Sequence, residues 1–423
     1  MVRRGDFLSQ SVDLAVVGAG ILGLAVAREA LLRHSGLRAR VFEKEPQIAT
    51  HQTGHNSGVI HAGVYYPPGS LKARLCVQGS REIYEYCDEH GISYERCGKV
   101  VVATSEDELP RLAEIHRRAR ANAVPGIELL DAAALAEIEP HVVGLRALHS
   151  PATGIVDFRR VANALADDVA RLGGELCLNA TIVGVEAGPR GVELQTQGET
   201  WRAKTVITCA GVYSDRLARM TGAPVAPKIV PFRGRYYSLR QGARSLVHGL
   251  VYPVPDPAFP FSRSSFHEAD LRGCVDRSER RARPLAEGYR TRDIDIRDLW
   301  ETVSYSGFRA LATKYWRTGL SELRADLSKR AFTAALQRLV PAVHAHDLTE
   351  SHSGVRAQAL TTEGQLLGDF WIDHAENVIH VRNAPSPGQA SRWRGRSSTS
   401  RRLRSRTCEP LPRPDEPRLV LRR

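Results

Sequence analysis

Residues 12–23 read VDLAVVGAGILG, a short apolar run that leads into three glycines at Gly-x-Gly-x-x-Gly spacing. The apolar run is typical of a buried parallel strand, and we expect a helix over about 21–34 after it. Residues 38–42 predict the next strand, which is followed by Glu43. A strand, a tight turn, a helix and a second strand at this spacing indicate an α/β fold.

The three glycines give the turn the properties of a dinucleotide-binding site. Gly18 permits the tight turn, Gly20 lets a pyrophosphate approach the helix N-terminus, and Gly23 lets the helix pack closely on the strand. Glu43 stands where a carboxylate accepts hydrogen bonds from ribose hydroxyls. Glycine triplets alone are common, so the surrounding strand, helix and acid carry the prediction of dinucleotide binding.

The stretch after Glu43 favours FAD over NAD. Residues 47–58 are rich in glycine, hydroxyl and histidine side chains, which suit contact with a flavin and its phosphates. A simple NAD-binding domain would continue into another helix and strand. Residues 205–211 predict an apolar strand that ends in small residues and returns to the same site. We therefore expect FAD to be bound by Gly18, Gly20, Gly23, Glu43, Thr53, Asn56, Ser57, Gly58 and Gly211.

Composition and charge limit the other function classes. The 423 residues suffice for two domains and contain no apolar run of about eighteen residues that would span a membrane. From residue 391 the chain carries eleven arginines against three acids, which is +8 of its net charge of +12. This tail has one aromatic residue, so we expect it to be disordered and do not expect nucleic acid as a partner.

The cysteines and the N-terminal stretch bear on disulfides, metal sites and localisation. Seven scattered cysteines without a Cys-x-x-Cys pair predict neither a disulfide framework nor a metal site. The first glycine-rich stretch is a turn entering a helix and not a signal peptide, so we expect a cytoplasmic protein. Peripheral contact with a membrane stays open.

The most specific stretch of the sequence is residues 51–66, HQTGHNSGVIHAGVYY, which lead into PGSLKARLC at 68–76. This stretch closely resembles the L-2-hydroxyglutarate dehydrogenase/oxidase family, which belongs to the D-amino-acid-oxidase-like superfamily of FAD-dependent oxidoreductases. Shorter matches follow in the family's order, at 153–157, 209–215, 230–234, 252–257, 353–358 and 383–387.

The resemblance implies an α/β fold with a Rossmann-like FAD-binding domain and a substrate domain built on a mixed or antiparallel sheet. It also implies oxidation of L-2-hydroxyglutarate to 2-oxoglutarate by hydride transfer to FAD. Oxygen, a quinone or another acceptor would reoxidise the flavin. We expect a discontinuous FAD-binding domain at 1–80, about 145–220 and about 345–390, and a substrate domain at about 81–144 and 221–344. Antiparallel strands are expected in the proline-rich stretch 229–261.

The reaction needs a base for the hydroxyl proton and cations for a small dicarboxylate substrate. Histidine is the natural base because its pKa lies near neutrality. His61 is our first candidate and His55 the second, although either could instead orient the loop or bond to FAD. Arginine binds carboxylates with two hydrogen bonds, so Arg356 is the first candidate clamp unless it forms a structural salt bridge. Arg233 and Lys72 are weaker candidates.

Two segments depart from the family pattern. Residues 262–284 show neither strand alternation nor a helical stripe, and the chain from 388 onward is rich in Arg, Ser and Pro. We hypothesise a compensated pair of frame changes at about 262–285 and an uncompensated one after 387. Resequencing that confirmed each base in a long, expressed transcript would contradict a sequencing error. Two alternatives stay open, namely an FAD-dependent amine or amino-acid oxidase and a non-catalytic remnant.

Overall fold

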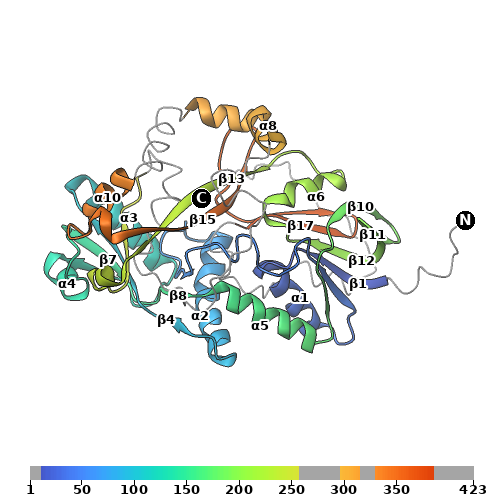
Figure 1. The fold of residues 1–423 in the computed structure, drawn as a ribbon, viewed down its shortest axis with the longest axis horizontal. Helices are drawn as coiled ribbons and strands as arrows, with labels where there is room; N and C mark the ends of the chain where they lie inside the picture. Colours follow the sequence, from blue (N-terminus) through green and yellow to red (C-terminus); the bar gives the residue numbers. More distant parts are fainter. Residues whose placement is uncertain (1–10, 257–295, 315–328, 385–423) are drawn as a thin grey trace, which may run out of the picture. The chain divides into compact units, whose positions relative to one another are not determined.

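The computed structural model describes residues 11–256, 296–314 and 329–384 (Figure 1). Within these ranges the strands form four sheets, of eight, four, three and two strands. None of the helices described there combines the length and the apolar character needed to cross a membrane. The two departing segments, 262–285 and 388–423, lie outside the described residues, and so does the predicted basic tail.

The largest sheet is built on the strand, turn, helix and strand that the sequence predicts. β1 (Ser11–Val17) lies parallel to β2 (Ala39–Phe42), and α1 (Ile21–Arg33) connects them. Leu14 and Ala15 point to opposite faces and are both fully buried, as in a parallel strand that is covered on both sides. The strand order is β10 (Ile182–Gly188), β11 (Gly191–Thr196), β12 (Thr200–Thr208), β1, β2 and β9 (Glu175–Cys177), with β17 (Val378–Asn383) beside β12 and β16 (Trp371–Ala375) beside β17.

Helices cover this sheet and bring the ends of its strands to one edge. α5 (Phe158–Arg171) packs beside α1 on one face, where both contribute to the same apolar core (Figure 1). α6 (Ser214–Met220) buries Leu217 in the core on the other face. Since β1, β2 and β12 are parallel, the residues that follow them meet at the same edge of the sheet.

A second sheet contains β14 (Leu250–Pro253), β5 (Lys99–Ala103), β7 (Arg146–Ser150) and β6 (Glu128–Asp131), in that order. β5, β7 and β6 are antiparallel to one another, whereas β14 is parallel to β5. α3 (Leu109–Ala121) packs on one face of this sheet. The other face packs against α4 (Ala132–Ile138) and α10 (Lys329–Gln337).

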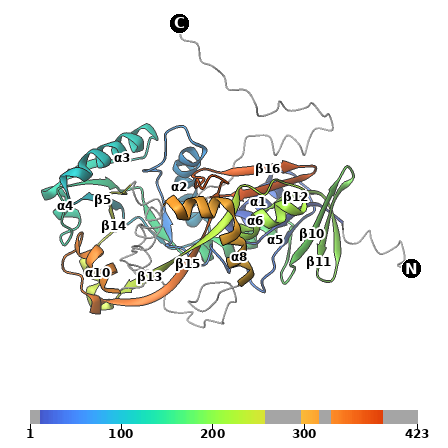
Figure 2. The same ribbon diagram turned by 90° about the horizontal axis from the view of Figure 1, so that it is seen from above.

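A long antiparallel ribbon and a small sheet complete the described fold. β13 (Lys228–Leu239) pairs with β15 (Leu348–Leu360) along its length (Figure 2). β3 (Val59–Ile60) and β4 (Tyr94–Glu95) both pair with β8 (Gly154–Val156). Further helical elements are α2 (Leu71–Glu89), α8 (Ile296–Ser304), a helical stretch over 306–314, and the short 3-10 turns η2 (Glu106–Glu108), η3 (Gly211–Tyr213), η4 (Gln241–Leu246) and η6 (Ala345–Asp347).

These elements confirm the expected α/β class with a Rossmann-like unit and mixed sheets. The expectation of antiparallel strands in 229–261 holds for β13 but is wrong for β14, which is parallel to β5. The domain ranges stay predictions. β7 falls in a range that we assigned to the FAD-binding domain, yet it pairs with β5 and β6 from the range assigned to the substrate domain.

Candidate active site

The glycine turn between β1 and α1 leaves a space that side chains at the glycine positions would fill. Gly18 has a φ of +107°, and a Cβ there would lie 2.5 Å from the carbonyl oxygen of Cys209. A Cβ on Gly23 would overlap the carbonyl oxygen of Gly18, so the first turn of α1 approaches the strand end without side chains between them. Gly20 is the N-cap residue of α1 and offers no side chain to the N–H groups of Leu22 and Gly23 in the first turn. These groups are therefore placed to meet a phosphate.

The carboxylate predicted at the end of β2 lies beside this turn. Glu43 is 8% exposed, and its Oε2 atom accepts a hydrogen bond of 2.7 Å from the backbone N–H of Ala19. Its Oε1 atom accepts a bond of 3.1 Å from the N–H of Glu45. These contacts fix the carboxylate at the edge where β1 and β2 end. That is the place a ribose would occupy in a dinucleotide-binding fold.

The histidine-rich loop folds onto the same helix terminus. Thr53 is buried, and its Oγ1 atom accepts a hydrogen bond of 3.1 Å from the N–H of Ile21, the first residue of α1. Asn56 holds the loop in shape, since its Nδ2 atom donates to the carbonyl of Thr53 at 2.6 Å and its Oδ1 atom accepts from Gly58 at 2.7 Å. Gly58 has a φ of +72°. Ser57 is half-buried in this loop.

Gln52 connects the loop to the long ribbon, a role that the sequence interpretation missed. Its Oε1 atom accepts a hydrogen bond of 3.1 Å from the N–H of Ala357 in β15. Its Nε2 atom would lie 3.0 Å from a Cβ on Gly211, which has a φ of +57°. The backbone of Arg356, which pairs with Phe232, is thereby held next to the loop. The side chain of Arg356 is not among those that the structure describes.

The two candidate bases occupy different parts of the loop. His55 is half-buried between Thr53 and Asn56, whereas His61 directly follows β3. The thiol of Cys76 in α2 donates a hydrogen bond of 3.0 Å to the carbonyl of His61. Burial raises the pKa of this thiol to about 12, so it stays protonated and can keep donating. The roles of both histidines stay predictions.

A fully buried lysine at the start of β5 is the second feature that the sequence interpretation missed. Lys99 is 2% exposed at the start of β5, and its ammonium lies 4.5 Å from the ring centre of Tyr65. The signal was present, because Lys99 is the one charged residue in the run KVVVA. A lysine at the head of such an apolar strand is rarely buried without a partner.

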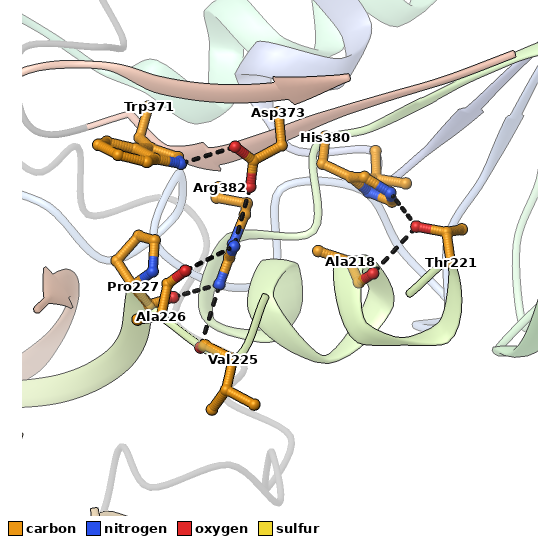
Figure 3. A network of polar contacts seen from close by, with 10 residues as sticks. Ala218, Thr221, Val225, Ala226, Pro227, Trp371, Asp373, His380 and Arg382 are labelled. Carbon is orange, nitrogen blue, oxygen red and sulfur yellow. Dashed lines mark hydrogen bonds and ion pairs between the residues drawn. The ribbon is translucent and has the colours of Figure 1, made fainter. Parts of the chain in front are cut away.

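A polar network at the end of β17 fixes the strand that pairs with β12 (Figure 3). His380 is buried, with Nδ1 2.9 Å from Oγ1 of Thr208 and Nε2 2.7 Å from Oγ1 of Thr221. Burial lowers the pKa of His380 to about 4, so it is neutral near pH 7. The Arg382 guanidinium pairs with Asp373 at 2.8 Å and donates to the carbonyls of residues 225–227. This network is structural.

The described residues fit a flavin dinucleotide. The glycine turn and the α1 terminus can receive the pyrophosphate, Glu43 can accept the ribose hydroxyls, and the loop around Thr53 and Gly211 lies at the same edge. Within the described ranges, no three His, Cys, Asp or Glu side chains gather as a metal site would require.

Comparison with known proteins agrees with this geometry. A family model described as FAD dependent oxidoreductase matches residues 13–393. The mitochondrial L-2-hydroxyglutarate dehydrogenase of Nematostella vectensis is 42% identical over 90% of this chain and 88% of its own. The human mitochondrial enzyme is 40% identical, over 90% of this chain and 86% of its own. The Escherichia coli L-2-hydroxyglutarate dehydrogenase is 39% identical, over 90% of each chain.

Solved structures share the fold at lower identity. L-alpha-glycerophosphate oxidase from Mycoplasma pneumoniae, whose structure has FAD bound, matches with a TM-score of 0.67 at 20% identity, over 90% of this chain and 92% of that one. Glycine oxidase from Geobacillus kaustophilus gives 0.63 at 19% identity over the same shares. FAD is therefore the cofactor. The chain belongs to the FAD-dependent oxidoreductase family, together with the L-2-hydroxyglutarate dehydrogenases.

Proposed function

We propose that this enzyme oxidises L-2-hydroxyglutarate to 2-oxoglutarate. The observation that carries the proposal is the loop 51–61, which folds onto the dinucleotide turn through Thr53 and presents His61 directly after β3. The 39–42% identity to L-2-hydroxyglutarate dehydrogenases over 90% of the chain supports the same substrate.

The reaction removes two electrons and two protons from a secondary alcohol. A base takes the proton of the hydroxyl group. The hydrogen on the carbon that bears this hydroxyl leaves as hydride, and the C–O single bond becomes a carbonyl. FAD, when bound, supplies the hydride acceptor. We propose that His61 takes the proton, with His55 as the alternative, because a neutral imidazole can accept a proton near pH 7.

The substrate carries two carboxylates and needs cationic partners. Arg356 is our first candidate, because Gln52 fixes the backbone of its neighbour Ala357 next to the FAD-binding loop. Lys72 is a second candidate, and it stacks on the ring of Tyr66 with its ammonium 4.6 Å from the ring centre. Arg233, which pairs with Val355 across the ribbon, is a third.

A substrate comparison with the purified, FAD-supplemented chain tests this function. L-2-Hydroxyglutarate should be consumed with formation of 2-oxoglutarate, and the D-enantiomer should be inert because it presents its hydride to the wrong face. Activity on amino acids or secondary amines, with none on L-2-hydroxyglutarate, would support the amine-oxidase alternative. A folded chain that holds flavin but oxidises neither class would support the remnant.

We further propose that the chain works in the cytoplasm and that oxygen, a quinone or another carrier takes up the electrons. Oxygen consumption during turnover would identify an oxidase. Turnover that requires an added quinone or dye would identify a dehydrogenase. Co-sedimentation with lipid vesicles would test whether the chain makes the peripheral membrane contact that the sequence leaves open.

A further inference from the structure

The buried lysine at the start of β5 has an unusual environment. Lys99 is 2% exposed, and its ammonium lies 4.5 Å from the ring centre of Tyr65 and 5.1 Å from that of Tyr252. Along β5 the side chains alternate, which places Lys99 on the same face as Val101. Tyr252, which pairs with Val101 on β14, joins the apolar core on that face.

Aromatic rings and a thiol surround this ammonium, where a buried cation would ordinarily have a carboxylate. Within the described ranges, no Asp or Glu forms an ion pair with Lys99. Burial lowers the pKa of Lys99 to about 8, and the nearby Cys76 only partly opposes this effect. Cation–π contacts with two tyrosines stabilise the charge in part. A buried ammonium is expensive unless an anion compensates it, so the environment suits an anionic ligand.

Lys99 lies against the elements that position His61, the proposed base. Tyr65 belongs to the same loop as His61, four residues further along the chain. Cys76, the neighbouring thiol, donates its hydrogen bond to the carbonyl of His61. The ammonium therefore lies against the two elements that hold His61, namely the loop after β3 and the first half of α2.

We propose that Lys99 binds a carboxylate of the substrate and so determines the preference of the enzyme for acidic substrates. This inference rests on the proposed function, since it assigns one carboxylate of the dicarboxylate to Lys99. An anion on Lys99 would compensate the charge of a buried ammonium that otherwise meets two tyrosine rings. Lys72 differs because it is only half-buried, and water can screen its charge.

Two substitutions at Lys99 and one at a matched lysine test the proposal. Lys99→Met removes the charge at similar volume, and Lys99→Arg keeps it. Lys228→Met is the control, because Lys228 is also buried, at 8% exposed, and lies 5.8 Å from the ring centre of Tyr305. The ammonium of Lys228 donates to the carbonyl of Glu301 at 2.7 Å, so it already has a protein partner. Flavin content and thermal unfolding would verify that each variant is folded and loaded.

The ligands are L-2-hydroxyglutarate as substrate and glutarate as an unreactive dicarboxylate, with L-2-hydroxyvalerate as a substrate that lacks the second carboxylate. Glutarate binding would be followed by the flavin absorbance spectrum. Lys99→Met should weaken glutarate binding and raise the KM for L-2-hydroxyglutarate by roughly 10- to 100-fold, as expected for loss of a charged hydrogen bond. Lys228→Met should change neither value. Weaker binding in Lys99→Met that is confined to the dicarboxylates would assign Lys99 to the distal carboxylate. An equally weakened binding of L-2-hydroxyvalerate would assign Lys99 to the carboxylate beside the hydroxyl.

The pH dependence gives a readout that a purely structural lysine would not move. In the wild type, glutarate affinity should vary little between about pH 7 and 7.5, where glutarate is fully ionised. It should fall as the pH rises through about 8, because Lys99 loses its proton there. Two titratable groups that face this ammonium, the Cys76 thiol and the Tyr65 hydroxyl, stay neutral in this window. Burial raises the pKa of the Cys76 thiol to about 12 and raises the pKa of Tyr65 as well. Lys99→Arg should retain its affinity above pH 8, since arginine does not titrate there.

The outcomes separate this proposal from the proposed function. Oxidation of L-2-hydroxyglutarate with glutarate affinity unchanged in Lys99→Met would overturn the role of Lys99 and leave the function intact. Glutarate binding that depends on Lys99, without oxidation of the hydroxy acid, would overturn the function and keep the role of Lys99. A flavin-loaded wild type that binds no dicarboxylate would overturn both.

Discussion

At the residue scale, the glycine turn gives a matched pair of tests. Gly18 and Gly36 both have positive φ, at +107° and +78°, but only a Cβ at Gly18 meets other atoms, with Cys209 O at 2.5 Å. Gly36→Ala should therefore cost about 1 kcal/mol of stability from backbone strain alone. Gly18→Ala should cost more and should abolish retention of FAD, measured as flavin per chain after gel filtration. Equal flavin retention in the two variants would contradict the assignment of the turn.

His61 provides the second test at this scale. His61→Asn keeps a polar side chain but removes the base, so kcat should fall by about 10²- to 10⁴-fold while flavin content stays unchanged. His55→Asn is the companion variant, and it should reduce kcat less. If His55→Asn lowers kcat more than His61→Asn does, His55 is the better candidate for the base.

The individual residues divide into those that a local pattern could predict and those that required the fold. Gly18 and Glu43 could be predicted because a tight turn and a terminal acid are defined by positions close in the sequence. The roles of Gln52 and Lys99 could not be predicted, because they depend on partners that are distant along the chain. Gln52 bonds to Ala357, 305 residues away, and Lys99 meets Tyr252 from another strand.

At the element scale, α2 begins with hydrogen bonds from two separate parts of the chain. Oγ of Ser70 accepts from the N–H of Ala73 at 3.1 Å, and the carboxylate of Asp369 accepts from the N–H groups of Leu71 and Lys72 at 3.2 and 2.9 Å. Asp369→Ala should lower the free energy of unfolding by about 1–2 kcal/mol, measured by urea denaturation, because it leaves two N–H groups without this acceptor. Asp369→Asn, which retains one acceptor oxygen, should cost less. An unchanged midpoint for Asp369→Ala would show that this cap is dispensable.

The elements themselves could largely be predicted, with an informative exception. α1 follows from the glycine turn after the apolar run, and β1 follows from that unbroken run. β14 was wrongly expected to be antiparallel, because its proline-rich neighbourhood indicates an edge strand but says nothing of direction. Strand direction is decided by long-range pairing, in this case with β5.

At the scale of the whole molecule, one buried carboxylate joins three helices. Asp168 in α5 is 2% exposed and pairs with Arg28 of α1 and with Arg171. Tyr86 of α2 donates a bond of 3.1 Å to it, and His90, directly after α2, lies at the same distance. Asp168→Asn should lower the free energy of unfolding at pH 7 by about 3–5 kcal/mol, since it leaves the buried Arg28 without its counter-charge.

The pH dependence of stability follows from the same carboxylate. Hydrogen bonds and charge from Arg28, His90 and Arg171 outweigh burial and hold the pKa of Asp168 well below its ordinary value. The folded state therefore binds fewer protons than the unfolded state at acidic pH, and this stabilisation is lost as the pH falls below about 4. Urea midpoints between pH 6 and pH 3 should fall less steeply in Asp168→Asn. As a control, Glu114→Gln should stay close to the wild type, because Glu114 is paired on the protein surface. Parallel profiles for Asp168→Asn and the wild type would contradict this account.

The central claim is that this chain holds FAD and reduces it with L-2-hydroxyglutarate. The most direct test is an anaerobic titration of the purified, FAD-supplemented protein with this substrate, followed by the absorbance of the oxidised flavin. The account predicts that the absorbance disappears as substrate is added and that 2-oxoglutarate forms in equal amount. Flavin that binds but stays oxidised, or a folded chain that retains no flavin, would contradict it.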